Sequence, residues 1–187
     1  SCARVRFALK SFMSTYGVPA YDERTKTGLL RHLYVRTNQA GESLCCILIN
    51  GKSLPHEKEL VDALRSAEPG LAGIVLGVNE KKNNVILGDS YHTLWGRDHL
   101  MDTLRGLTFK LSVPSFYQVN TPQAEVLYGI ALDFAALTGE ETVVDLYCGI
   151  GTITLCLAQR AKRAIGAEIV PEAIEDAKEN ACRNSLH

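Results

Sequence analysis

The chain has 187 residues, of which 46% are hydrophobic and 22% are charged, and its formal net charge is −1. These values are ordinary for a globular protein, and they exclude a global electrostatic field that would draw the chain to nucleic acid or to a membrane surface. No apolar run reaches the length of a membrane-spanning helix, so we expect a cytoplasmic protein with no membrane partner.

The cysteines and the chain ends add two expectations. None of the six cysteines stands in a C-x-x-C pair, so no zinc or iron–sulfur site is predicted and the thiols are expected to be free. The chain opens at Ser1 and closes at His187, inside a pattern that is typical of a helix. We therefore expect it to be a fragment of a longer protein.

The first half of the chain is rich in predicted strands. Alternating apolar residues predict strands over 4–10 and 30–37, and a more deeply buried strand is expected over 43–49. A helix is predicted over 56–67 because apolar residues recur there at helical spacing. Further strands are expected over 73–78, 84–87 and 107–111. Together these elements indicate a small α+β domain with an antiparallel sheet over residues 1–108.

The second half alternates helices and strands. A helix is predicted from Thr121-Pro122 to about residue 138, and it is followed by a strand that ends at Asp145. The apolar residues that recur at helical spacing in this helix are Leu127, Ile130, Ala131, Phe134 and Leu137. A helix over 152–160, a strand ending near Glu168 and a final helix from Pro171 come next. This order indicates a parallel sheet in residues 109–187. Only two strands are available, so we expect an incomplete sheet with one exposed edge at which chains could associate.

A glycine-containing loop between two acidic residues is the strongest chemical feature. Gly149 and Gly151 allow a ligand to approach the backbone, and Asp145 precedes them while Glu168 follows the next strand. A carboxylate at Asp145 would repel a pyrophosphate but suits the cationic S-adenosyl-L-methionine, whose ribose Glu168 could hold. A nicotinamide dinucleotide is the alternative, although Thr154 stands where its third glycine is expected. The remaining interpretation is a turn that binds nothing.

A second segment, residues 111–122, combines a proline, two aromatic residues, Gln118 and Asn120 between a strand and a helix. It is either a loop with binding character or a linker whose aromatic side chains fill a domain junction.

Together the two segments resemble the RNA uracil-5-methyltransferases, which methylate C5 of uridine in ribosomal or transfer RNA. Residues 116–120 (Phe-Tyr-Gln-Val-Asn) resemble the family's F-x-Q-V-N, and residues 145–152 resemble its D-L-[FY]-C-G-x-G-[NT]. Residues 166–173 resemble its G-[VI]-E-x-x-x-E-A, and Asn180 stands where the family commonly has A-x-x-N-A. The resemblance covers roughly residues 107–184.

The resemblance implies a fold, a cofactor and a substrate. The fold would be α/β: a partial Rossmann-like methyltransferase domain preceded by a small α+β central domain. S-adenosyl-L-methionine would be contacted by Gln118, Tyr147 and Glu168. The loop around it would be shaped by Asp145, Gly149, Gly151 and Thr152. The substrate would be RNA, with 23S ribosomal RNA preferred over transfer RNA.

The same resemblance places the nucleophilic cysteine and the general base downstream of residue 187, so no catalytic residue is assigned and the fragment alone is expected to be inactive. Cys148 is interpreted as a small buried side chain and Cys156 as a core residue. Two other functions stay open from the sequence: a nicotinamide-dependent oxidoreductase and a non-catalytic RNA-binding module.

Overall fold

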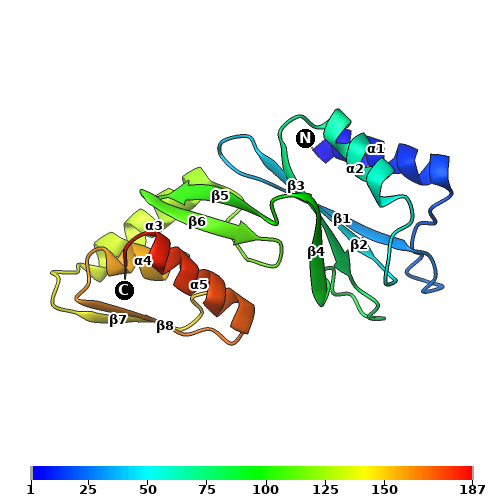
Figure 1. Cartoon of the computed structure of the whole chain (residues 1–187). Helices are drawn as coiled ribbons and strands as arrows, with labels where there is room; N and C mark the ends of the chain where they lie inside the picture. The colour runs from blue at the N-terminus through cyan, green and yellow to red at the C-terminus, as the bar shows by residue number, and fades with distance from the viewer. Residues whose placement is uncertain (1, 187) are drawn as a thin grey trace. The chain divides into compact units, whose positions relative to one another are not determined.

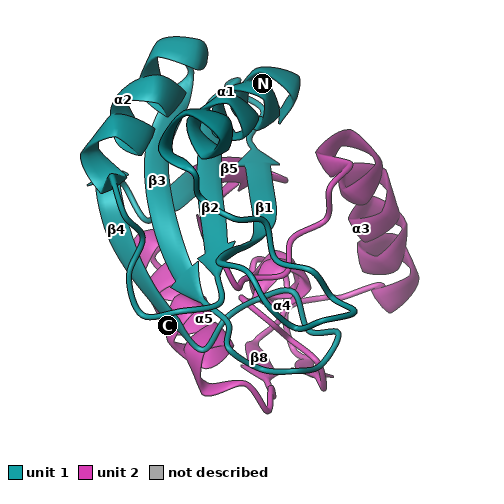
Figure 2. Cartoon of the chain, turned by 90° about the vertical axis from the view of Figure 1, so that its right-hand side faces the viewer, with its two compact units in different colours: residues 1–100 teal, residues 101–187 magenta. Residues whose placement is uncertain are grey.

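The structure is a computed structural model that describes residues 2–186 (Figure 1). The chain divides into two compact units, residues 1–100 and 101–187 (Figure 2). The observed division falls within the strand β5 (His99–Leu104), whereas the boundary expected at 108/109 lies further along the chain, inside the strand β6 (Leu107–Ser112). Within residues 2–186, no helix combines the length and the apolar character needed to cross a membrane.

Unit 1 is a four-stranded sheet with helices on one face (Figure 2). Its strands lie in the order β1-β2-β3-β4, and β2 and β3 are parallel because α2 crosses over between them. The other two strand pairs are antiparallel. The elements are α1 (Cys2–Tyr16), β1 (Leu30–Thr37), β2 (Ser43–Ile49), α2 (Glu57–Ala67), β3 (Leu71–Val78) and β4 (Ser90–Gly96).

The core of unit 1 lies between the two helices and the sheet. α1 and α2 contribute Phe12, Leu60 and Leu64, which pack with Ile47 and Ile74 from the central strands. β2 is buried along its whole length, as its continuous apolar run and its central place in the sheet predict. The strands predicted over 30–37, 43–49 and 73–78 are confirmed as β1, β2 and β3, and the helix predicted over 56–67 is confirmed as α2.

Three predictions for unit 1 were wrong. Residues 4–10 are helical, because Val5, Ala8, Leu9 and Phe12 form a buried stripe at helical spacing that the alternation of Val5, Phe7 and Leu9 obscured. Residues 84–87 are a loop whose carbonyl groups at 85–87 accept hydrogen bonds from Asn79 Nδ2. The sheet is mixed and not purely antiparallel.

Unit 2 combines a β-hairpin with a βαβ segment. β5 and β6 join through Arg105 and Gly106, which both have positive φ angles (50° and 78°), as two-residue hairpin turns require. β7 and β8 pair in parallel on either side of α4, which confirms the predicted parallel pairing. The elements are β5 (His99–Leu104), β6 (Leu107–Ser112), α3 (Thr121–Ala135), β7 (Thr142–Asp145), α4 (Thr152–Ala158), β8 (Arg163–Gly166) and α5 (Pro171–Arg183).

Helix α3 forms where it was predicted, but a different face is buried. Ala124, Tyr128 and Leu132 are buried, whereas Leu127 and Phe134 from the predicted apolar stripe are exposed. The helix has apolar residues around most of its circumference, so periodicity alone does not identify the inner face. Its first turn is capped by Asn120, whose Oδ1 accepts a hydrogen bond from the Gln123 N–H at 3.2 Å.

Candidate functional site

The parallel pairing of β7 and β8 brings the two predicted acidic residues to one edge of the sheet. Asp145, the last residue of β7, lies opposite Gly166, the last residue of β8. The Ala167 N–H donates to the Asp145 carbonyl at 2.8 Å, and the Cys148 N–H donates to the Ala167 carbonyl at 3.1 Å. The two chain segments that leave the sheet are thus held together at the carboxyl ends of the strands, where ligands of parallel α/β sheets bind.

The loop between β7 and α4, residues 146–151, is called the Gly loop below. Glu168 forms a hydrogen bond with this loop. Its Oε2 accepts a hydrogen bond from the Gly149 N–H at 3.1 Å. Its Oε1 accepts from the Ile169 and Val170 N–H groups at 2.7 and 3.1 Å. These backbone bonds, with those to Val170 and Ile169 strongest, hold the pKa of the Glu168 carboxyl below its ordinary value. The carboxylate is therefore ionised and fixed beside the Gly loop.

Asp145 is fixed in a similar way by donors from its own segment. Its Oδ2 accepts a hydrogen bond from Thr154 Oγ1 at 2.5 Å, and its Oδ1 accepts from the Tyr147 N–H at 3.3 Å. In the sequence, Thr154 is evidence only against a dinucleotide cofactor, because a glycine would be expected at this position. Its position, three residues after Gly151, places its hydroxyl in the first turn of α4, within reach of the strand end.

The Gly loop is open to a ligand at two positions. Gly149 has a φ angle of +52°, and a Cβ atom placed on it would meet nothing within 4 Å. The side chain of Tyr147 is 89% exposed. A planar group could therefore lie beside the Tyr147 ring while the backbone at Gly149 comes close to it. Gly151, with a φ angle of +86°, turns the chain into α4.

The other two predicted site residues lie on the neighbouring elements. Thr152 Oγ1 is 3.1 Å from the Tyr128 hydroxyl, so it joins the start of α4 to α3. Gln118 lies between β6 and α3, in residues 113–120, which we call the Gln segment. Within residues 2–186, no hydrogen bond joins the Gln118 side chain to Asp145, to Glu168 or to the Gly loop.

The cysteines near the loop are poor nucleophiles. Burial raises the pKa of the Cys148 thiol, and the carboxylates of Asp145 and Glu168 raise it further. Burial also raises the pKa of Cys156 to about 11. Since the thiolate is the reactive form, neither side chain is prepared for attack on a substrate.

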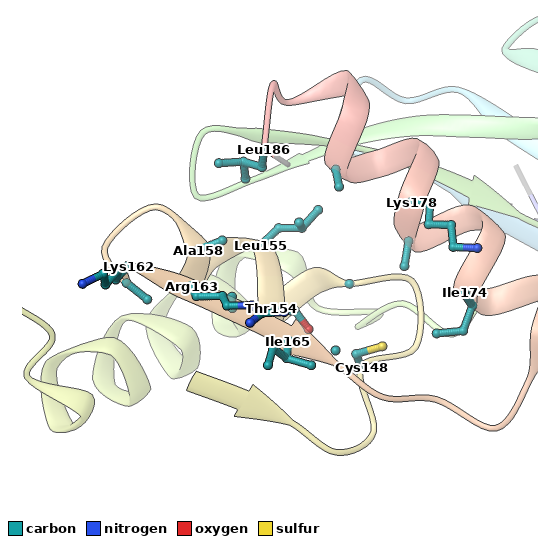
Figure 3. Close-up of a pocket in the computed structure, with 16 residues that line it drawn as sticks. Cys148, Thr154, Leu155, Ala158, Lys162, Arg163, Ile165, Ile174, Lys178 and Leu186 are labelled. Carbon is teal, nitrogen blue, oxygen red and sulfur yellow. The ribbon is translucent and has the colours of Figure 1, made fainter. Parts of the chain in front are cut away.

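A cavity of about 490 Å³ lies behind the Gly loop, between α4, β8 and α5. Figure 3 shows Leu155, Ile165 and Ile174 among its lining residues, which are mostly apolar. Asp145 and Glu168 are not part of this lining. The two carboxylates therefore do not face this cavity, although Cys148 and Gly151 of the Gly loop line it.

The chain matches the family model described as tRNA (Uracil-5-)-methyltransferase over residues 34–187. It is 48% identical over 179 residues to a protein named as an RNA methyltransferase from Halalkalibacterium halodurans, and 47% identical over 179 residues to one from Listeria monocytogenes. Each alignment covers 95% of this chain but 39% of the relative, so the chain spans about two fifths of these relatives' length.

A similar fold is found in the crystal structure of Pyrococcus abyssi tRNA (uracil-54, C5)-methyltransferase, which was solved in complex with S-adenosyl-L-homocysteine. The TM-score is 0.79 at 24% sequence identity, and the match covers 98% of this chain and 44% of that one. At this level of identity the similarity establishes a shared mixed α/β fold.

Proposed function

This chain belongs to the RNA (uracil-5-)-methyltransferase family, and from that premise we propose that it carries the S-adenosyl-L-methionine-binding part of an enzyme that methylates C5 of uridine in RNA. On this proposal, unit 2 is the first part of a Rossmann-like methyltransferase domain and unit 1 is the central domain that precedes it. The complete reaction belongs to the longer protein, of which the chain spans only part of the length seen in its relatives.

The observation that carries the proposal is the pair of fixed carboxylates, Asp145 and Glu168, on either side of an open Gly loop at one sheet edge. S-adenosyl-L-methionine bears an ammonium and a sulfonium group, which negative charge attracts, whereas a dinucleotide pyrophosphate would be repelled. The chemistry of the residues present therefore fits the methyl donor better than it fits a nicotinamide cofactor.

Each residue of the site has a proposed part in holding the cofactor. Tyr147 would flank its planar base. Glu168 Oε2 would accept from a ribose hydroxyl, since among residues 2–186 the Gly149 N–H is its one donor. Asp145, Gly149, Gly151 and Thr152 would shape the loop. Gln118 would reach the cofactor from the Gln segment. When bound, S-adenosyl-L-methionine would supply the methyl group.

The substrate of the longer protein would be RNA, and we propose 23S ribosomal RNA as the preferred target. None of the cysteines in the Gly loop or α4 suits the nucleophilic step, because the pKa values of Cys148 and Cys156 are raised. The nucleophile and the general base would then lie elsewhere in the longer protein, and the chain by itself would bind cofactor without turnover.

Isothermal titration of the chain with S-adenosyl-L-homocysteine, and separately with NAD, tests the cofactor assignment. We expect saturable binding of the first and none of the second. Binding of NAD in place of S-adenosyl-L-homocysteine would support an oxidoreductase. Salt-dependent binding of RNA with no affinity for either small molecule would support a non-catalytic RNA-binding module.

A further inference from the structure

One face of α5 consists of polar side chains that bond to the outer edge of β6 and to the segments around it. Asp176, Asn180 and Asn184 are spaced by four residues, so they lie in one row along the helix. Thr108, Lys110 and Ser112 alternate along β6 and meet this row. An adjacent stripe of α5, with Ile174, Ala177 and Ala181, lines the apolar cavity.

Asn180 connects β6 to the Gly loop. Its side chain is fully buried, its Oδ1 accepts a hydrogen bond from the Lys110 N–H at 2.7 Å, and its Nδ2 donates to the Ile150 carbonyl at 3.1 Å. Ile150 lies between the two glycines of the loop. The amide offers an acceptor to the strand and a donor to the loop at the same time. The side chain therefore fixes the middle of the Gly loop relative to β6.

Asp176 makes the equivalent connection to the Gln segment. Its Oδ2 accepts hydrogen bonds from the Ser112 and Ser115 hydroxyl groups, both at 2.7 Å. Ser115 is buried and lies three residues before Gln118. The carboxylate thus anchors the start of the Gln segment, one helical turn away from the point where Asn180 anchors the Gly loop.

We propose that Asp176 and Asn180 are positioning residues that hold the Gln segment and the Gly loop at a fixed spacing on the frame of α5. The inference rests on the proposed function, in which these two segments form opposite sides of the cofactor site. Neither residue touches the cofactor in this arrangement; each acts through the backbone or hydroxyl groups that it bonds.

The test compares matched substitutions on the same face of α5. Asn180→Asp keeps the acceptor for the Lys110 N–H but places an oxygen against the Ile150 carbonyl, so the contact to the loop is lost. It also adds a negative charge, which the control below adds as well. Asn184→Asp is the matched control, because Asn184 bonds Thr108 and the Asn180 carbonyl but not the Gly loop. Asp176→Ala removes the acceptor for both hydroxyl groups, and Asp176→Asn restores an oxygen there.

Two measurements are made on each variant of the chain. We expect Asn180→Asp and Asp176→Ala to bind S-adenosyl-L-homocysteine about tenfold more weakly, because the first sets an oxygen against the Ile150 carbonyl and the second removes the charged acceptor that the Ser112 and Ser115 hydroxyl groups share. Asn184→Asp and Asp176→Asn should stay within about twofold. In NMR spectra, the Gly149 and Gly151 amide signals should move in Asn180→Asp and remain in place in Asn184→Asp.

The outcomes separate this inference from the proposed function. If the unsubstituted chain does not bind S-adenosyl-L-homocysteine but the glycine signals respond as described, the proposed function fails and the positioning by Asn180 stands. If Asn184→Asp displaces those signals as much as Asn180→Asp, the positioning role is wrong, because the effect is then a general loss of helix packing. Should Asn180→Asp not fold, Asp176→Ala and its rescue by Asp176→Asn decide the question.

Discussion

Glu168 and Gly149 are 19 residues apart in the sequence and are joined by a hydrogen bond from the Gly149 N–H to Glu168 Oε2 at 3.1 Å. The bond links the loop that follows β7 to the loop that follows β8. A residue proposed to bind the cofactor ribose therefore also organises the backbone that the cofactor would approach. On the proposed function, one carboxylate would couple ligand binding to the order of the loop.

Replacing this carboxylate should affect both properties. In Glu168→Gln, one oxygen becomes an NH₂ group that must face a backbone N–H, and the charge is lost. We expect affinity for S-adenosyl-L-homocysteine to fall by at least about tenfold, which corresponds to about 1.4 kcal/mol. Titration calorimetry measures this, and Glu172→Gln, an exposed neighbour in the first turn of α5, is the control. Equal affinity in both variants would contradict the proposed role.

The ion pair between Arg4 and Glu68 should stabilise unit 1. The Glu68 side chain is 4% exposed, and Arg4 donates to both of its oxygens at 2.7 to 3.1 Å. Because Arg4 is 61% exposed, solvent screens the pair, and we expect Arg4→Ala to lower the free energy of unfolding by about 1–2 kcal/mol. Chemical denaturation measures the difference. Arg6→Ala, at an exposed position on the same helix, should change it little.

The same ion pair predicts a pH dependence. Burial opposes ionisation of Glu68, but the bonds from Arg4 outweigh it and lower the pKa of the carboxyl below its ordinary 4.5. A lowered pKa means that the stabilisation is present above pH 4.5 and is lost as the pH falls through the folded-state value. In Arg4→Ala the loss should begin at a higher pH. Denaturation curves collected between neutral and acidic pH test this, and an unchanged acid transition would contradict it.

Cysteine alkylation should follow burial. Cys2 and Cys182 are exposed, whereas the other four cysteines are buried. Burial raises the pKa of Cys46 to about 12 and that of Cys156 to about 11. Iodoacetamide at mildly alkaline pH should therefore label Cys2 and Cys182 in the folded chain, and label Cys148 only after unfolding, as read by peptide mass spectrometry. Rapid labelling of Cys148 in the folded chain would contradict its interpretation as a buried, unreactive side chain.

Gly166 should not tolerate a larger side chain. A Cβ atom on it would lie 2.9 Å from Cys148 Sγ and 3.0 Å from Cys148 Cβ, so Gly166→Ala should lower the free energy of unfolding by about 1–3 kcal/mol. Adding Cys148→Ala removes the sulfur and should recover part of the loss. Thermal or chemical denaturation of the single and double variants measures both effects. An additive double variant would show that the contact is not the cause.

The βαβ segment could be predicted because its determinants are local. A β-branched run, two glycines and an acidic residue at each strand end specify the order of elements around the Gly loop without reference to the rest of the chain. The parallel pairing followed from the alternation of strand and helix. The same reasoning succeeded for β2, whose continuous apolar run indicates a central strand.

Other features depend on packing that sequence periodicity does not specify. Val5, Phe7 and Leu9 alternate as in a strand, yet Val5, Ala8, Leu9 and Phe12 suit a helix equally well, and the sheet of unit 1 selects the helix. β4 was missed because neither face of Ser90–Gly96 is consistently apolar. The backbone partners of Glu168 were also beyond prediction, since they require the exact meeting of two loops.

The row of amides along α5 also decides where this chain can aggregate. The Asn184 side chain forms hydrogen bonds with both the N–H and the C=O group of Thr108, and the Asn180 side chain accepts one from the N–H group of Lys110. The outer edge of β6 is therefore closed to an incoming strand from another molecule. Loss of the α5 amides would expose this edge of β6 and open it to strand addition from another molecule.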